Sequence, residues 1–188
     1  MELLIEEEKY TVEDFRKMEN LDENHYYELI EGKILGRELE SPNSKHDKVA
    51  TKIFWKLSLF ALKNKLGNVF RSPVNIQINT TNLFQPDVSF ISNKNEESTF
   101  GENDLGIPNL VVEVLIPEKG MYVRGKKKRI YEQNGVQEYW IVDLINQVIE
   151  VYVLENKYFI LHSYNLEKEK VVSNLFKELD LSGEEIFV

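Results

Sequence analysis

The feature that most constrains the fold is a short apolar segment, LVVEVLI, at residues 110–116. It is apolar on both faces apart from Glu113, which is typical of a strand buried in the middle of a sheet. An ionised carboxylate among such neighbours is costly unless it is paired with a cation or bound to a metal. The segment therefore predicts a central strand that carries either a structural ion pair or a functional acid.

The elements expected around this strand alternate between helices and strands. Thr11 is expected to cap a short helix that ends near Met18, and apolar residues at helical spacing predict a helix from near Ser44 to Lys65 that stops at Gly67. A third helix is expected from about residue 123 to a glycine stop at residues 134–135. The expected strands are two short ones within 26–35 around a turn at 31–32, and then 74–79, 86–91, 110–116, 138–142, 148–154 and 158–162. A polar stretch at 93–106 is expected to be a surface loop. This order predicts an α/β fold with a central mixed β-sheet flanked by α-helices.

The length of 188 residues and the composition fit a single domain. We expect an N-terminal helical and acidic segment at 1–24, a core at 25–165 and an acidic tail at 166–188. The N-terminal residues are acidic rather than basic, and no apolar run approaches the ~20 residues that a membrane helix needs. We therefore expect a cytoplasmic protein that does not bind membranes.

Composition also excludes several kinds of site. The chain has no cysteine, which rules out disulfides, zinc-thiolate sites and cysteine nucleophiles, and its three histidines are too scattered for a recognisable zinc motif. The net charge of −9 argues against a protein that coats nucleic acid nonspecifically. Residues 119–129, however, hold six basic residues and no acid. This stripe fits either a polyanionic ligand or an ordinary solvated helix face.

Two further residues join Glu113 as candidates for a functional site. Pro86 cannot donate a ladder hydrogen bond and is expected at the start of its strand, so Asp87 projects near that end. Two acids from neighbouring strands could converge on one Mg²⁺ or Mn²⁺, which prefer hard oxygen ligands. Lys127 falls in the middle of the helix face that is expected to pack on the sheet. The alternative for Lys127 is a side chain whose ammonium reaches water past its apolar stem.

Two weaker candidates lie earlier in the chain. Glu28 is an acid in the segment Tyr-Tyr-Glu-Leu-Ile, and it is either functional or part of the polar face of a strand. His46 is either a site residue or an ordinary residue in the first turn of its helix.

Five blocks in a fixed order carry a family resemblance. The blocks are YELIEG at 27–32, SP at 41–42 with His46, QPD at 85–87, VVEVL at 111–115 and GVQEYWIVD at 135–143. In this order, over nearly the whole chain, they resemble the Uma family of restriction-endonuclease-like proteins within the PD-(D/E)xK nuclease superfamily. The resemblance implies a restriction-endonuclease-like fold and a metal-dependent endonuclease that hydrolyses phosphodiester bonds, with DNA as the substrate and Mg²⁺ or Mn²⁺ as the cofactor. We also expect a homodimer.

The resemblance assigns roles residue by residue. Asp87 and Glu113 match the metal ligands of the family, with the backbone carbonyl of Val114 as a third ligand. Lys127 matches the lysine that orients or helps to deprotonate the attacking water and offsets charge on phosphorus. Glu28 matches an acid that an earlier element contributes around the metal.

Further residues are expected to contact the nucleic acid: His46, Lys119, Arg124, Lys126 and Lys128. The chain departs from the family pattern in the segment IPEK at 116–119 and at Val123, where relatives carry an aspartate. These departures leave two other hypotheses open. One is a nucleic-acid-binding or assembly protein that kept the nuclease fold and lost turnover; the other is a structural domain in which Glu113 and Lys127 form a buried ion pair.

Overall fold

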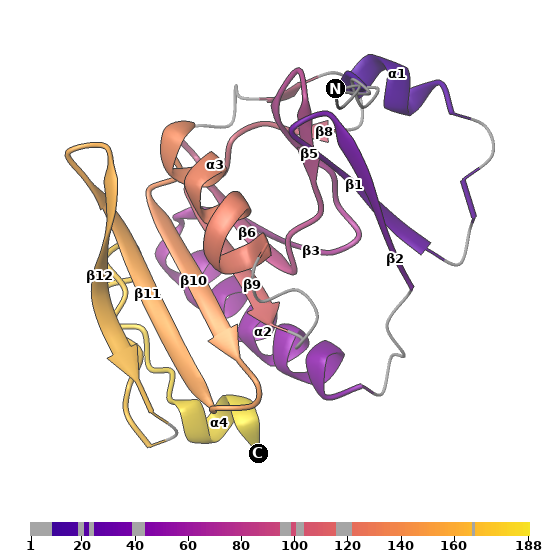
Figure 1. The fold of residues 1–188 in the computed structure, drawn as a ribbon. Helices are drawn as coiled ribbons and strands as arrows, with labels where there is room; N and C mark the ends of the chain where they lie inside the picture. The colour runs from indigo at the N-terminus through magenta and orange to yellow at the C-terminus, as the bar shows by residue number, and fades with distance from the viewer. Residues whose placement is uncertain are drawn as a thin grey trace, which may run out of the picture.

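The protein is described by a computed structural model that covers residues 9–18, 21–22, 25–38, 44–94, 99–100, 104–115, 122–166 and 168–188. Its strands form two six-stranded sheets, with helices on both faces of the larger one (Figure 1). The expected α/β fold with a mixed sheet and flanking helices is confirmed. Among the described residues, no helix combines the length and the apolar character needed to cross a bilayer.

The central sheet is built around the buried segment that the sequence singled out. Its strand order is β12 (Tyr158–Asn165), β11 (Val148–Glu155), β10 (Glu138–Asp143), β9 (Leu110–Leu115), β6 (Val88–Ser92) and β3 (Gly67–Arg71). Strands β9 and β10 are parallel and the other neighbours are antiparallel, so the sheet is mixed. Every residue of β9 is buried, as predicted for a central strand.

The smaller sheet has the order β2 (Lys33–Glu38), β1 (His25–Ile30), β5 (Asn82–Phe84), β4 (Ile76–Asn79), β8 (Asp104–Leu105) and β7 (Thr99–Phe100). The predicted hairpin is present: β1 and β2 pair around Glu31 and Gly32, which both have positive φ angles, of 52° and 81°. Strands β7 and β8 lie in the segment predicted to be a surface loop, so that part of the prediction was wrong. Each is only two residues long, and they form by pairing: β8 pairs with β4, and β7 pairs with β8.

Helices cover the two faces of the central sheet. On one face lie α2 (Lys45–Asn64) and α4 (Gly183–Phe187); on the other lie the π-helical turn η2 (Tyr122–Lys127), α3 (Lys128–Gln133) and the smaller sheet. Successive residues of β9 alternate between the two cores: Val112 and Val114 pack toward α2, whereas Val111 and Leu115 pack toward η2 and α3. Glu113 therefore points to the face that η2, α3 and the smaller sheet cover.

The first two helices begin with the caps that the sequence indicated. Thr11 and Asp14 form a capping box at the start of α1 (Val12–Arg16), and the Ser44 side chain accepts the Asp47 N–H at the start of α2. Helix α2 stops at Lys65, which adopts the left-handed conformation itself, so Gly67 is not the helix stop but the first residue of β3.

The C-terminal residues are part of the core. Phe176, Leu181 and Ile186, within the segment expected to be an acidic tail, are buried on the α2 side of the central sheet. The segment is held there by Glu138, which has no exposed surface. Its carboxylate accepts hydrogen bonds from the side chains of Trp140 (2.6 Å) and Ser173 (2.7 Å) and from the N–H groups of residues 174 and 175 (3.0 and 2.8 Å). Glu138 thus fixes the C-terminal segment onto β10.

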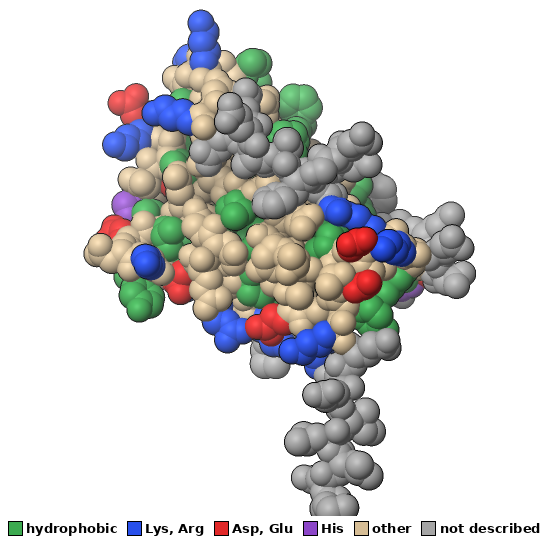
Figure 2. Space-filling model, turned by 90° about the horizontal axis from the view of Figure 1, so that it is seen from above, with side chains coloured by type: hydrophobic (Ala, Val, Ile, Leu, Met, Phe, Trp, Pro, Cys, Tyr) green, Lys and Arg blue, Asp and Glu red, His purple; other side chains and the backbone are tan. Residues whose placement is uncertain are grey.

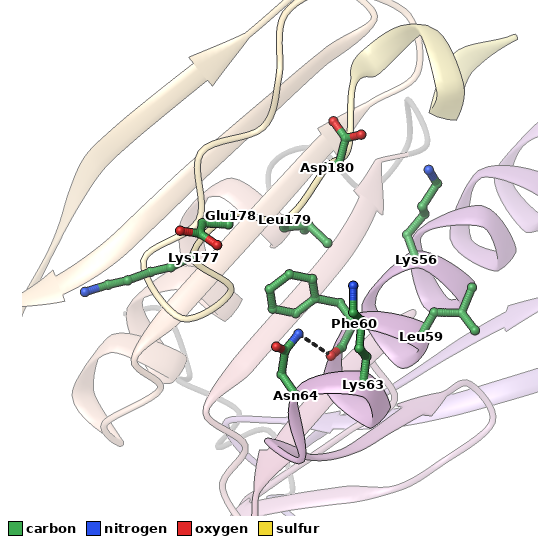
Figure 3. Close-up of a pocket in the computed structure, with 9 residues that line it drawn as sticks. All are labelled: Lys56, Leu59, Phe60, Lys63, Asn64, Lys177, Glu178, Leu179 and Asp180. Atoms are coloured by element: carbon green, nitrogen blue, oxygen red, sulfur yellow. Dashed lines mark hydrogen bonds between the residues drawn. The ribbon is translucent and has the colours of Figure 1, made fainter.

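A surface pocket of about 370 Å³ lies between the second half of α2 and residues 177–180 (Figure 3). Lys56, Phe60 and Lys63 line it from the helix, and Glu178 and Asp180 line it from the opposite side. The pocket is on the α2 side of the sheet, whereas Glu113 points to the other side. It is therefore separate from the candidate site described next.

Candidate active site

Lys127 is the centre of a buried cluster of charged side chains. Only 5 % of its surface is exposed, and its ammonium lies 2.8 Å from Glu28 Oε1 and 2.9 Å from Glu113 Oε1. The helical phase placed Lys127 on the sheet-facing side, and the structure agrees. The turn that carries it is π-helical rather than α-helical, a local widening that is frequent at functional sites.

Glu113 reaches the cluster from the middle of β9. Its Oε1 accepts a second hydrogen bond, from the phenol of Tyr131 in α3, at 3.1 Å. Burial raises the pKa of Glu113, the ammonium of Lys127 opposes this, and the negative charges of Glu28 and Asp87 raise the pKa further. The net result is a raised pKa, with burial as its largest cause and the two neighbouring acids adding to it.

Glu28 enters the cluster from β1 in the smaller sheet. Its Oε1 accepts the backbone N–H of Gln85 at 2.7 Å as well as the Lys127 ammonium. Gln85 directly precedes the Pro86-Asp87 element, so this bond fixes the loop between β5 and β6 against β1. Lys127 thus joins acids from two different sheets.

Asp87 lies just before β6 and is 3 % exposed. The antiparallel pairing of Val88 with Val112 places Asp87 one step further along, beside Glu113 on the neighbouring strand. Its Oδ2 accepts the N–H of Val114 at 2.7 Å. Because the N–H and the carbonyl of one strand residue point to the same side, the Val114 carbonyl also faces the Asp87 side of β9.

His46 was expected to contact nucleic acid, and the structure places it elsewhere. It is buried in the first turn of α2, and its Nε2 lies 3.3 Å from Asp87 Oδ1. The turn of α2 that follows Ser44 packs directly against the start of β6, which leaves the imidazole inside the acidic cluster rather than on an accessible surface.

The Lys127 ammonium remains charged. Burial alone would lower its pKa, but attraction to Glu113 and Glu28 and hydrogen bonds to both outweigh burial and raise the pKa. Three acids, Glu28, Asp87 and Glu113, therefore share one lysine and one histidine within a buried volume.

Few carboxylate oxygens of the cluster are available to bind a hard divalent cation. Glu28 and Glu113 each use Oε1 for internal hydrogen bonds, and within the described ranges no hydrogen bond reaches either Oε2. In the part of the chain that the structure describes, no group of three or more His, Cys, Asp or Glu side chains is arranged to hold a metal ion. A site for Mg²⁺ here would therefore combine two carboxylates with a backbone carbonyl, the oxygen ligands that this ion accepts.

The basic residues expected to contact phosphates are already engaged with other side chains. Arg124 bonds Glu150 (2.6 Å) and Asp143 (3.1 Å). Lys126 lies 3.5 Å from Glu31, and the Lys128 ammonium lies 3.4 Å from the centre of the Tyr152 ring. Lys119 falls outside the described residues. On the face seen in Figure 2, basic and acidic side chains are interspersed rather than gathered in one basic patch.

Two residues that contact the acids were not identified from the sequence. Tyr131 lies four residues after Lys127 on the same helix face, so its position gave a usable signal, but a tyrosine there reads as core packing. Gln85 acts through its backbone N–H, for which side-chain identity gives no signal.

The fold and the site together define a restriction-endonuclease-like domain. The sheet is mixed, its central strand carries a buried acid, the neighbouring strand begins with a second acid, and the following helix supplies a lysine. The Uma2 family model, described as putative restriction endonuclease, matches residues 12–183, and the chain belongs to this family. The resemblance seen in the sequence is thereby confirmed.

A solved structure shares the fold. It is the crystal structure of a putative nuclease belonging to DUF820 from Anabaena variabilis ATCC 29413, with a TM-score of 0.76 and 20 % sequence identity. The similarity covers 94 % of this chain and 97 % of that one. No curated protein matches this chain.

Proposed function

We propose that this protein is a nuclease that uses a divalent metal to hydrolyse phosphodiester bonds in DNA. Family membership and the shared fold support nuclease activity. The observation that carries the proposal is the buried ammonium of Lys127, which bridges Glu28 and Glu113, with Asp87 beside Glu113 on the neighbouring strand. Perturbed ionisable groups packed together in this way are common at catalytic sites.

Asp87, Glu113 and the Val114 carbonyl would hold Mg²⁺ or Mn²⁺, with Glu28 in the surrounding shell. The gathering of three acids around one lysine supports this assignment, because a bound cation would offset the repulsion among their carboxylates. When bound, such a metal lowers the pKa of a water molecule and offsets charge on phosphate oxygens.

Lys127 would act as a fixed positive charge beside the reacting phosphate. Because its pKa is raised, the ammonium stays protonated at neutral pH. This favours orienting the water and stabilising the negative charge that develops on phosphorus over removing a proton. The bonds to Glu28 and Glu113 hold the ammonium in place before substrate arrives.

DNA is proposed as the substrate because of the family to which the chain belongs, not because of a dedicated base-reading element. With a net charge of −9, the chain would approach a polyanion only where metal and lysine reverse the local field. We further propose that the protein acts in the cytoplasm and as a homodimer.

The contacts of Lys127 also fit the two rival hypotheses, a nucleic-acid-binding or assembly protein without turnover and a structural domain with a buried ion pair. Lys127 already has two carboxylate partners, and among the described residues no cluster of three metal-binding side chains exists. A purely structural ion pair would have these same contacts.

A cleavage assay separates these hypotheses. Wild-type protein and an Asp87→Ala variant are incubated with single- and double-stranded DNA and RNA in the presence of Mg²⁺, Mn²⁺ or a chelator. We expect the wild type to cut DNA with either metal, and chelation or Asp87→Ala to abolish cutting. Binding of DNA without cleavage under all conditions would favour the binding or assembly protein.

A further inference from the structure

Strand β12 is an open edge of the central sheet. It pairs with β11 on one side, and in the strand order of the described residues nothing follows it on the other. Such an edge presents a row of backbone N–H and carbonyl groups that another strand can pair with. In Figure 1 it forms the outermost element of the sheet.

The side chains of this edge are unusually apolar. Six large apolar residues on β12 or shortly after it are 49–66 % exposed: Tyr158, Ile160, Leu161, Tyr164, Leu166 and Val172. The strand itself, YFILHSYN, contains no Asp, Glu, Lys or Arg, in a chain in which 29 % of residues are charged. The exposed apolar side chains lie on both faces of the strand, because Ile160 pairs with Val153 of one core and Leu161 pairs with Tyr152 of the other. Exposed apolar surface on both faces of an open edge is typical of a surface that contacts another macromolecule.

The other sheet edges in the described structure are more charged, packed or shorter. Strand β2, KILGRE, has three charged residues in six. Strand β3, at the opposite edge, packs against α2 and ends at Arg71, which is ion-paired with Asp47. Strand β7 is only two residues long. On β12, eight residues long, the protective device is a bulge at His162, where the pairing steps from Leu161 to Ser163. Exposed apolar side chains lie on both sides of that bulge, so it does not close the edge.

We propose that β12 pairs antiparallel with β12 of a second copy of this chain, which joins the two central sheets across a two-fold axis. A two-fold axis pairs the same edge from each copy, so both open rows of backbone groups are satisfied at once. Charge also favours this face: two chains of net charge −9 repel each other, and an uncharged strand is where they approach with least repulsion.

A second apolar stripe competes for this role and fits it less well. Trp55, Leu59 and Leu62 are exposed along the outer face of α2. Lysines at positions 52, 56 and 63 flank them, so two copies meeting through α2 would bring like charges together. The α2 stripe therefore supplies a matched control.

The inference specifies the homodimer proposed above and does not depend on the cleavage chemistry. In the strand order of the central sheet, β9 with Glu113 lies three strands in from β12. Each copy of the dimer therefore keeps its own complete cluster.

The test measures molar mass by sedimentation and light scattering across a range of protein concentrations. Leu161→Lys places a charge on the proposed interface, and Leu62→Lys places the same charge on the α2 stripe. We expect wild type and Leu62→Lys to be dimers and Leu161→Lys to be a monomer with an unchanged circular dichroism spectrum. Amide exchange at 158–165 is expected to slow as wild-type concentration rises.

A wild-type monomer at high micromolar concentration would overturn the proposal, as would dissociation by Leu62→Lys instead of Leu161→Lys. If Leu161→Lys fails to fold, Tyr164→Lys takes its place, because Tyr164 is also exposed and lies on the far side of the bulge. Mass is read independently of hydrolysis, so an inactive dimer would contradict the proposed nuclease and leave this interface standing.

Discussion

The phenol of Tyr131 donates a hydrogen bond to Glu113 Oε1, the same oxygen that binds the Lys127 ammonium. Burial and the nearby charge of Glu113 raise the pKa of Tyr131 well above its usual value, so the phenol stays neutral and remains a donor. Two donors on one oxygen fix the rotation of the Glu113 carboxylate and leave Oε2 directed away from them. Tyr131 is thus a positioning residue for the proposed metal ligand.

We predict that Tyr131→Phe weakens the stabilisation that Mg²⁺ or Mn²⁺ gives to the folded protein. Wild type should show a higher melting temperature with metal than with chelator, because the metal binds the native state. The variant should show a smaller increase, measured by calorimetry with each metal.

Tyr139→Phe is the matched control for Tyr131→Phe. Tyr139 is as buried as Tyr131 and its ring packs against the Tyr131 ring, but its hydroxyl donates to the Val123 carbonyl. Loss of either buried hydroxyl should cost about 1–2 kcal/mol of stability. Equal metal-induced increases in the two variants would show that Tyr131 has only a structural role.

Lys127→Ala should abolish cleavage and destabilise the protein. Removing the ammonium leaves Glu28 and Glu113 buried without their cation, a change that costs about 3–5 kcal/mol when a buried pair is broken. Lys126→Ala, at a partly exposed lysine one residue earlier, should weaken DNA binding modestly, more so at low salt, and spare the cleavage step. Cleavage rates in single-turnover assays and urea unfolding curves test both effects; near wild-type turnover of Lys127→Ala would show that the lysine is not catalytic.

The raised pKa of Glu113 predicts an unusual dependence of stability on pH in metal-free protein. The folded state holds this proton more tightly than the unfolded chain, in which the ordinary pKa is 4.5. Below pH 4.5 Glu113 is protonated in both the folded and the unfolded state. As pH rises from there through the folded-state pKa, the unfolded chain releases this proton first, so ionisation favours the unfolded state and the free energy of unfolding falls. Glu113→Gln removes this loss, so its free energy of unfolding relative to wild type should increase over that window, as measured by urea unfolding with a chelator present. Wild-type and Glu113→Gln profiles that run parallel would contradict the assignment.

Glu138 predicts a separate effect on stability alone. Glu138→Ala leaves the Trp140 indole and the N–H groups of residues 174 and 175 without their acceptor, at about 1–3 kcal/mol for each group left unsatisfied. We expect a large loss in the free energy of unfolding and greater protease sensitivity near residue 174. The metal-induced rise in melting temperature should persist, because Glu138 does not contact the site. An unchanged unfolding curve would mean that the C-terminal segment is held by its apolar residues alone.

Much of the fold was predictable because helix caps and the spacing of apolar residues depend on the local sequence. The central strand followed from an apolar run with one acid, and α2 followed from its cap at Ser44 and its apolar spacing. Strands β3, β5, β7 and β8 were not predicted, because short strands depend on neighbours that only the tertiary structure supplies. Lys127 was placed on the correct face by helical phase. Its contact with Glu113 was predicted only by the hypothesis of a buried structural ion pair, and its bond to Glu28 was not predicted, because no sequence spacing shows that the smaller sheet packs against η2.

The long separation between the partners in the cluster has a consequence for synthesis. The Lys127 ammonium binds an acid 99 residues earlier in the chain, and Asp87 meets Val114 across 27 residues. The nascent chain therefore cannot hold the assembled cluster until Lys127 has emerged from the ribosome and the two sheets have docked. The proposed nuclease would in this way remain inert while it is being made.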